Sequence, residues 1–114
     1  MLNRNEIISH CLTYKDAYED YPFGEEMAVI RHSGNKKTFA FIYERGGKLF
    51  INLKCEPLRA DFLRQVYTAV TPGFHMNKTH WNTVALDGSI PDEELFSMVK
   101  HSYELIKPKD KKIK

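Results

Sequence analysis

The architecture can be derived from one segment, Thr38-Phe39-Ala40-Phe41-Ile42-Tyr43-Glu44-Arg45-Gly46-Gly47-Lys48-Leu49-Phe50-Ile51-Asn52-Leu53-Lys54. Residues 38–43 are rich in aromatic and β-branched side chains, which is typical of a β-strand. Gly46-Gly47 predicts a two-residue turn, because type I′ geometry requires positive φ at both central positions. Alternation along residues 49–54 then gives the returning strand two distinct faces. Leu49, Ile51 and Leu53 share the face expected to meet helices, and the other face carries Phe50, Asn52 and Lys54.

Three helices are predicted around this hairpin. Asn3 and Glu6 resemble a capping box at the start of a short amphipathic helix. Pro57 suits the first turn of a second helix, and Pro91, followed by three acidic residues, opens a third. In the second helix Arg59 and Arg64 are expected to face solvent. The residues expected to form its buried stripe are Leu58, Phe62, Leu63 and Val66.

Three further strands are expected over residues 27–30, 68–71 and 81–86. Residues 18–24, with Pro22 and Gly24, are expected to form a break after the first helix. The predicted order is α-β-β-β-α-β-β-α. This order indicates an α+β two-layer domain, with an antiparallel five-stranded sheet and the helices packed on one face. Residues 1–106 are expected to be a single domain, and the basic residues 107–114 a mobile tail.

The length of 114 residues allows one domain with its own core. The chain does not begin with a basic region and apolar run typical of a signal peptide. No apolar run approaches the ~20 residues that span a bilayer. We therefore expect a cytoplasmic protein without a membrane partner. In a reducing compartment Cys11 and Cys55 are expected to be free thiols.

Charge is unevenly distributed, although the net charge is only +2. Residues 31–80 carry nine Lys and Arg against three acids, and residues 107–114 carry five lysines against one acid. A basic middle segment favours a polyanion partner where its side chains converge, because phosphate contacts dominate nucleic-acid affinity. The alternative is an ordinary solvated face. The residues assigned to a nucleic-acid site, in which amides could read base edges, are Lys54, Arg59, Asn77, Lys78 and Asn82.

A second candidate site lies in Thr71-Pro72-Gly73-Phe74-His75-Met76-Asn77-Lys78-Thr79-His80-Trp81-Asn82-Thr83, which holds the only tryptophan and two of the five histidines. His75, His80 and Trp81 are interpreted either as a ligand site or as a structural clasp. No further metal ligands lie close to the two histidines, so no metal is expected. No nucleophile–base pair is visible, so neither a catalytic residue nor a cofactor is assigned.

Specific blocks of sequence resemble the MmcQ/YjbR family of small bacterial proteins. The resemblance implies a secretion-chaperone-like or frataxin-like two-layer fold, and it brings the label of DNA-binding protein. It supplies no catalytic residues. Fold similarity alone is a weak warrant for function. The blocks are Tyr21-Pro22-Phe23-Gly24, residues 37–41, Asn52-Leu53-Lys54-Cys55, residues 71–78, His80-Trp81-Asn82-Thr83 and Ser102-Tyr103.

Together these patterns indicate a non-enzymatic binding module. The leading hypothesis is DNA binding through the basic middle segment and the edge from His75 to Trp81. One alternative is a protein-interaction adaptor that uses an exposed sheet face or groove. Independently of this choice, Phe23 is interpreted either as part of a turn that fastens the first helix to the sheet or as the border of a groove next to the Trp81 strand. The other alternative is a small-ligand binder or enzyme centred on His75, His80 and Trp81. The sequence does not indicate the oligomeric state.

Overall fold

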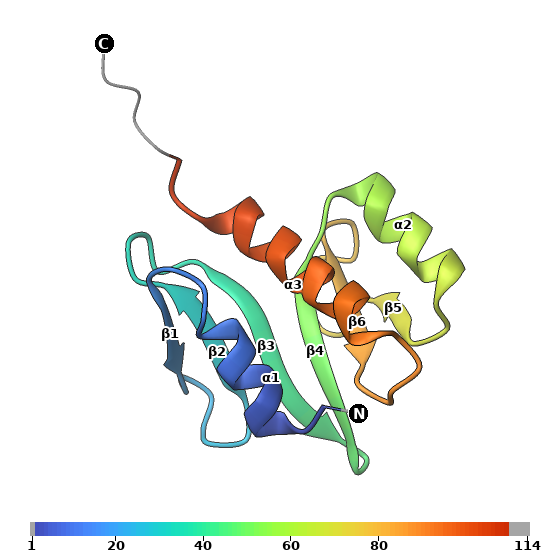
Figure 1. The fold of residues 1–114 in the computed structure, drawn as a ribbon, viewed down its shortest axis with the longest axis horizontal. Coiled ribbons are helices and arrows are strands. Elements are labelled where there is room, and N and C mark those ends of the chain that lie inside the picture. The colour runs from blue at the N-terminus through green and yellow to red at the C-terminus, as the bar shows by residue number, and fades with distance from the viewer. Residues whose placement is uncertain (1, 110–114) are drawn as a thin grey trace.

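The computed structural model describes residues 2–109, which form three helices and six strands (Figure 1). The predicted basic tail lies outside the described residues from residue 110 onward. The elements in chain order are α1 (Arg4–Cys11), β1 (Ala17–Asp20), β2 (Ala28–His32), β3 (Thr38–Arg45), β4 (Lys48–Lys54), α2 (Pro57–Val66), β5 (Val70–Pro72), β6 (Trp81–Ala85) and α3 (Asp92–Ile106).

The strands form one antiparallel sheet in the order β1-β2-β3-β4-β6-β5. The prediction of an antiparallel α+β sheet is confirmed, but the predicted five strands are wrong, because β1 adds a sixth. This strand has four residues, lies at the edge of the sheet and pairs only with β2. Its sequence, Ala-Tyr-Glu-Asp, has none of the apolar alternation by which a half-buried strand is recognised.

The central hairpin has the predicted register. Glu44 pairs with Leu49 and Arg45 with Lys48, so the chain reverses over Gly46-Gly47. Both glycines have positive φ, 59° and 78°, as a type I′ turn requires. Asn3 also caps α1 as predicted, since its side chain accepts a hydrogen bond from the Glu6 amide and the Glu6 side chain bonds back to the Asn3 amide.

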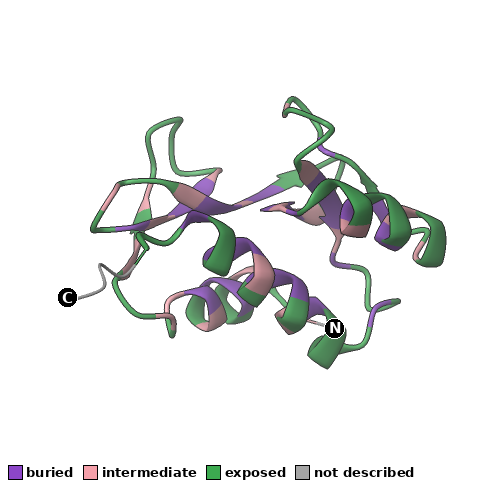
Figure 2. Ribbon diagram, turned by 90° about the horizontal axis from the view of Figure 1, so that it is seen from above, coloured by how far each residue is buried: buried purple, intermediate pink, exposed green. Residues whose placement is uncertain are grey.

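Helices α1 and α3 cover one face of the sheet (Figure 2). The core between these layers contains Ile51 and Leu53 from β4, with Met98 from α3, whereas Leu49 is half-buried at its margin. The buried Ser102 of α3 ties the layers together: its hydroxyl donates to the Phe39 carbonyl (2.6 Å) and accepts from the Lys54 amide (2.9 Å). Both cysteines are buried free thiols, as expected.

Helix α2 lies at the β5–β6 end of the sheet and is rotated from its predicted orientation (Figure 1). It packs through Ala60 and Leu63. Arg64, expected in solvent, points instead to the β6 strand, where its Nε donates to the Asn82 Oδ1 (2.7 Å). The predicted buried stripe is therefore wrong at three positions. The exposed fractions are 89%, 62% and 50% for Leu58, Phe62 and Val66.

No helix within residues 2–109 is long and apolar enough to cross a membrane.

The different burial of Leu53 and Leu58 gives a stability prediction. Leu53→Ala removes a side chain that is 2% exposed and should lower the free energy of unfolding by about 2–5 kcal/mol. Leu58→Ala, at 89% exposure, is the matched control and should change it by about 0.5 kcal/mol or less. Urea denaturation of the three proteins measures both values. Equal losses would contradict the orientation of α2 described above.

Candidate functional site: a groove on the open face of the sheet

The face of the sheet opposite α1 and α3 carries a row of residues in register across four strands. Val29 of β2 pairs with Phe41 of β3, Phe41 with Asn52 of β4, and Asn52 with Thr83 of β6. Side chains at paired positions lie on the same face. This row therefore joins an apolar half to a polar half at the centre of the sheet.

The polar half is a closed hydrogen-bond network. Asn52 Oδ1 accepts from the Tyr43 hydroxyl (2.9 Å) and from the Thr83 hydroxyl (2.7 Å). Thr83 Oγ1 in turn accepts from the backbone amide of Phe74 (2.8 Å), and the Asn52 amide donates to the Phe74 carbonyl (3.3 Å). Asn52 and Thr83 are almost completely buried. The network thus fastens the loop that follows β5, residues 73–80, to the sheet.

Further contacts hold the same loop from its two ends. The Gly73 amide donates to the Trp81 carbonyl (2.9 Å), and a Cβ at residue 73 would lie 2.8 Å from the Trp81 Cβ, so only glycine fits this approach. Lys78 Nζ donates to the Gly73 carbonyl (2.9 Å). Arg64 Nη2 donates to the Lys78 carbonyl and to the Trp81 carbonyl (3.2 Å). The loop is therefore built into the fold.

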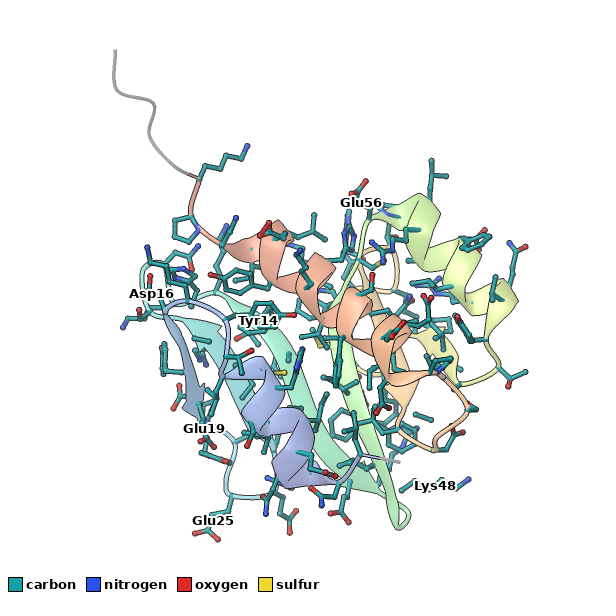
Figure 3. The ribbon with its side chains drawn as sticks, in the orientation of Figure 1. Tyr14, Asp16, Glu19, Glu25, Lys48 and Glu56 are labelled. Atoms are coloured by element: carbon teal, nitrogen blue, oxygen red, sulfur yellow. The ribbon has the colours of Figure 1, made fainter. Side chains whose placement is uncertain are left out.

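A groove of about 550 Å³ lies between this loop and the loop that joins β1 to β2. The second loop is held by α1, because the Arg4 guanidinium donates to the carbonyls of Glu25 and Glu26 (both 2.8 Å); Glu25 stands out from that loop in Figure 3. The floor of the groove comes from β3 and β4. The groove is lined mainly by aromatic and methionine side chains, with Asn52, and the apolar members are Phe23, Met27, Phe41, Tyr43, Phe74 and Met76.

The charges of the groove are few and of both signs. Glu26 and Glu44 contribute to its lining, and no salt bridge within residues 2–109 involves either of them. The Arg45 guanidinium lies over the ring of Phe74 (3.8 Å) and the ring of Phe50 (4.8 Å). Such cation–π contacts hold the arginine against the loop wall. The groove is consequently apolar in the middle, with the carboxylates of Glu26 and Glu44 and the Arg45 guanidinium at its margins.

A second hollow, of about 590 Å³, lies at the hairpin end of the sheet, where Figure 3 labels Lys48. It includes Arg4, Glu44, Lys48 and Asp87. Its lining mixes charges of both signs and lacks the concentrated aromatic floor of the first groove. We therefore take the aromatic groove as the candidate site.

His75, His80 and Trp81, the second candidate site from the sequence, have different positions in the structure. His75 lines the groove and has φ of 58°, and its ring is tilted by 50° against that of Phe74, with centroids 4.0 Å apart. Trp81 is half-buried and packs edge-on against Phe41, with ring centroids 5.6 Å apart. His80 is exposed, and its backbone carbonyl accepts from the Cys55 amide (2.8 Å). Trp81 thus braces the groove floor, and the structure does not bring the two histidine rings together.

The predicted nucleic-acid residues do not form one patch. Asn82 is buried, and its amide bonds to Arg64 and to the Ala60 carbonyl, so it is not available at the surface. Asn77 is exposed and accepts from the Thr79 amide (2.9 Å), whereas the Lys78 ammonium is bound to its own loop. None of these three residues lines the groove.

Lys54 of β4 pairs with Trp81 of β6, and Arg59 lies beside α3. Arg59 Nη2 donates to the Ser97 hydroxyl (3.2 Å). Lys54, Arg59 and His101 line a cavity of only about 10 Å³, which is too small for a ligand. His101 Nε2 accepts from the Glu56 amide (3.2 Å) at the start of α2, and Figure 3 shows Glu56 where β4 leads into that helix. This cavity therefore offers no room for a ligand.

Within residues 2–109 no group of three His, Cys, Asp or Glu side chains could hold a metal ion. Burial raises the pKa of the Cys11 thiol to about 12. It also raises the pKa of Cys55, so neither thiol favours the nucleophilic thiolate form.

Sequence reasoning singled out His75 and the segment that contains Phe74 and Met76, and one interpretation placed Phe23 at the border of a groove, but it missed the residues that form the floor. Asn52 was placed on the strand face opposite the helices. A polar amide in the middle of an otherwise apolar strand was the one feature of the sequence that could have indicated the network. The partners of this amide, Tyr43 and Thr83, come from other strands, and only the register brings them together.

These features define a small two-layer α+β domain with one sheet face covered by helices and the other hollowed into an aromatic groove. The chain belongs to the YjbR family, whose family model matches residues 12–105. The resemblance to MmcQ/YjbR proteins is thereby confirmed.

Known relatives extend over most of the chain. It is 31% identical to the uncharacterized protein YyaQ of Bacillus subtilis, over 94% of this chain and 100% of YyaQ. It is 42% identical to the uncharacterized protein YjbR of Escherichia coli K12, over 58% of this chain and 56% of that protein. These names state no ligand.

Solved structures share the same fold. A Pseudomonas syringae protein superimposes with a TM-score of 0.83 at 30% identity, covering 93% of this chain and 100% of the other. A Deinococcus radiodurans protein with a DUF419 domain gives a TM-score of 0.84 at 32% identity, covering 93% of this chain and 79% of the other.

The buried network gives a direct prediction. Thr83→Val keeps the side-chain shape but removes both the donor to Asn52 and the acceptor for the Phe74 amide. The free energy of unfolding should fall by about 1–3 kcal/mol, because buried polar groups lose their partner. Thr68→Val, at an exposed position shortly before β5, should cost about 0.5 kcal/mol or less. Denaturant titration followed by Trp81 fluorescence compares them; equal losses would refute the role of the network.

The surroundings of His101 lead us to predict that the free energy of unfolding depends on pH. Burial, then the nearby Arg59 guanidinium, lowers the pKa of His101 from its ordinary value of 6.5, although the Glu56 carboxylate opposes this. Between the two pKa values the unfolded chain binds more protons at His101 than the folded chain does. The free energy of unfolding should therefore decrease as the pH falls through 6.5 toward the lower pKa of the folded state. His101→Gln should flatten this loss, because an amide accepts from Glu56 without titrating.

The control for that measurement is His80→Gln, at an exposed position. Thermal denaturation from neutral to mildly acidic pH should give the parent profile for this variant. An unchanged profile for His101→Gln would show that other groups cause the acid loss.

Proposed function

We propose that this protein is a non-enzymatic binding module and that the groove on its open sheet face holds an apolar segment of a partner protein. The observation that carries the proposal is the groove itself: about 550 Å³ of space with a fixed aromatic floor and two loop walls. Pockets of this size with mainly apolar linings and a few polar groups are typical of binding sites.

The residue types in the walls favour a polypeptide over a single small molecule. Met27 and Met76 come from opposite loops and face a common space. Methionine side chains are flexible and polarizable, so surfaces that contain them adapt to apolar side chains of varied shape. Exposed Phe23 and Phe74 add large apolar area to the same surface, as aromatic residues do at protein interfaces. Phosphate recognition requires no such lining.

DNA binding by the basic middle segment is the rival proposal. It rests on the charge of residues 31–80 and on the exposed side chains of Asn77 and Lys78. Against it, Glu26 and Glu44 add negative charge to the groove, and the Lys78 ammonium already binds the Gly73 carbonyl. A ligand site or enzyme centred on His75, His80 and Trp81 has less support, because only His75 of these three lines the groove.

The test uses peptides selected from a displayed library of amphipathic sequences and then synthesised. Binding should change the fluorescence of Trp81, because this ring contacts the groove floor through Phe41. Phe23→Asp should weaken the selected peptides about tenfold or more, since it removes an aromatic contact at the interface. Phe23 is 71% exposed, so the variant should fold normally.

Leu105→Asp is the control, because Leu105 is an exposed apolar residue of α3 outside the groove. It should bind like the parent. A random-sequence DNA duplex is titrated in parallel at several salt concentrations. Affinity for the duplex with a steep negative salt slope, together with no selected peptide sensitive to Phe23→Asp, would favour the rival.

A further inference from the structure

Helix α2 carries an apolar stripe that nothing in the described chain covers. Its members Leu58, Phe62 and Val66 are spaced by four residues, so they lie on one side of the helix. Their exposed fractions are 89%, 62% and 50%. No residue of α2 lines the groove. One molecule therefore presents both an empty apolar groove and an uncovered apolar helix face, in separate places.

The dimensions of the two surfaces agree. Val66 lies eight positions after Leu58, so the stripe is about 12 Å long. Along the groove floor β3 runs from Phe41 to Arg45, which corresponds to about 14 Å. The walls stand near β2 and β6, which are three strand spacings or about 14 Å apart, whereas a helix with side chains is about 10–12 Å wide. A helix parallel to the floor strands is therefore comparable in width with the backbone distance between these two strands.

The charges beside the two surfaces are also complementary. Arg59 flanks the stripe on one side, and Asp61 lies toward its other side, where Gln65 donates to it (2.9 Å). In the groove, Glu26 belongs to one wall and Arg45 is held against Phe74 of the other. With the stripe facing the floor, one helix orientation sets Arg59 toward Glu26 and Asp61 toward Arg45. Charge pairs of this kind determine orientation more than affinity.

We propose that the groove receives helix α2 of a second copy of this chain, with Phe62 as the central anchor. This inference rests on the proposed function of the groove and names its occupant. The contact follows the helix-in-groove mode, in which residues one turn apart insert as anchors. Since the two surfaces differ, the association is head to tail and closes into a ring or continues as a chain. One short helix buries little area, so the association is weak and depends on concentration.

The experiment uses two variants that each lose one of the two surfaces. Phe62→Asp disrupts the stripe and keeps the groove, and Phe23→Asp disrupts the groove wall and keeps the stripe. Both positions are exposed, so both variants should fold; circular dichroism checks this. Sedimentation velocity across a concentration series should show self-association of the parent and of the Leu105→Asp control. Each variant alone should associate about tenfold or more weakly.

Mixing the two variants should restore association, limited to a one-to-one heterodimer, because only one intact groove and one intact stripe remain. A parent that stays monomeric throughout would overturn the inference. So would a dimer that Phe62→Asp abolishes but Phe23→Asp preserves, since that result indicates pairing of α2 with α2. The selected peptides distinguish failure of this inference from failure of the proposed groove function. If the parent stays monomeric but binds peptides, and Phe23→Asp weakens that binding, only the second copy as occupant is refuted.

Discussion

The buried amide of Asn52 is the constraint on which the open face of this domain depends. Its oxygen accepts from Tyr43 and Thr83, and its nitrogen donates to the carbonyl of Phe74. A buried amide without these partners would be costly, so strand register and loop position must be satisfied together. Because Thr83 also accepts from the Phe74 amide, the loop of residues 73–80 cannot leave the sheet without exposing several polar groups at once. One wall of the groove is thus part of the folded core.

The two faces of the sheet are stabilised by different means. Helices α1 and α3 bury the first face through aliphatic packing, with Ser102 bonded to both central strands. The second face has no helical layer and keeps its order through the polar network and the loops. Its other wall depends on α1, since Arg4 binds the carbonyls of Glu25 and Glu26. A helix of the covered face therefore positions a wall of the open one.

The unusual composition of the segment from Thr71 to Thr83 now has a physical explanation. Gly73, Lys78 and Thr83 serve to build the loop, through a close backbone approach and hydrogen bonds. The groove receives Phe74, His75 and Met76 from the same loop. From the sequence, a ligand site and a structural clasp were alternative interpretations of this segment. In the structure, some residues of the segment build the loop and others line the groove. Relatives named only as uncharacterized proteins add a family and a fold, so the function is argued from this surface.

The sequence by itself determined the local elements, the hairpin with its Gly46-Gly47 turn, the α+β class and the family, because turn chemistry and periodicity act over a few residues. Only the tertiary structure decided what each face meets. Helical spacing predicted one buried stripe of Leu58, Phe62, Leu63 and Val66, but only Leu63 is buried, because an amphipathic pattern cannot say which of its apolar residues meet the core. Edge strand β1 escaped detection because the alternation of a half-buried strand is missing there. The hydrogen bond from Arg64 withdrew Asn82 from the predicted site, and the bond to the Gly73 carbonyl within the same loop withdrew the Lys78 ammonium. Strand register alone joined Asn52 to Thr83.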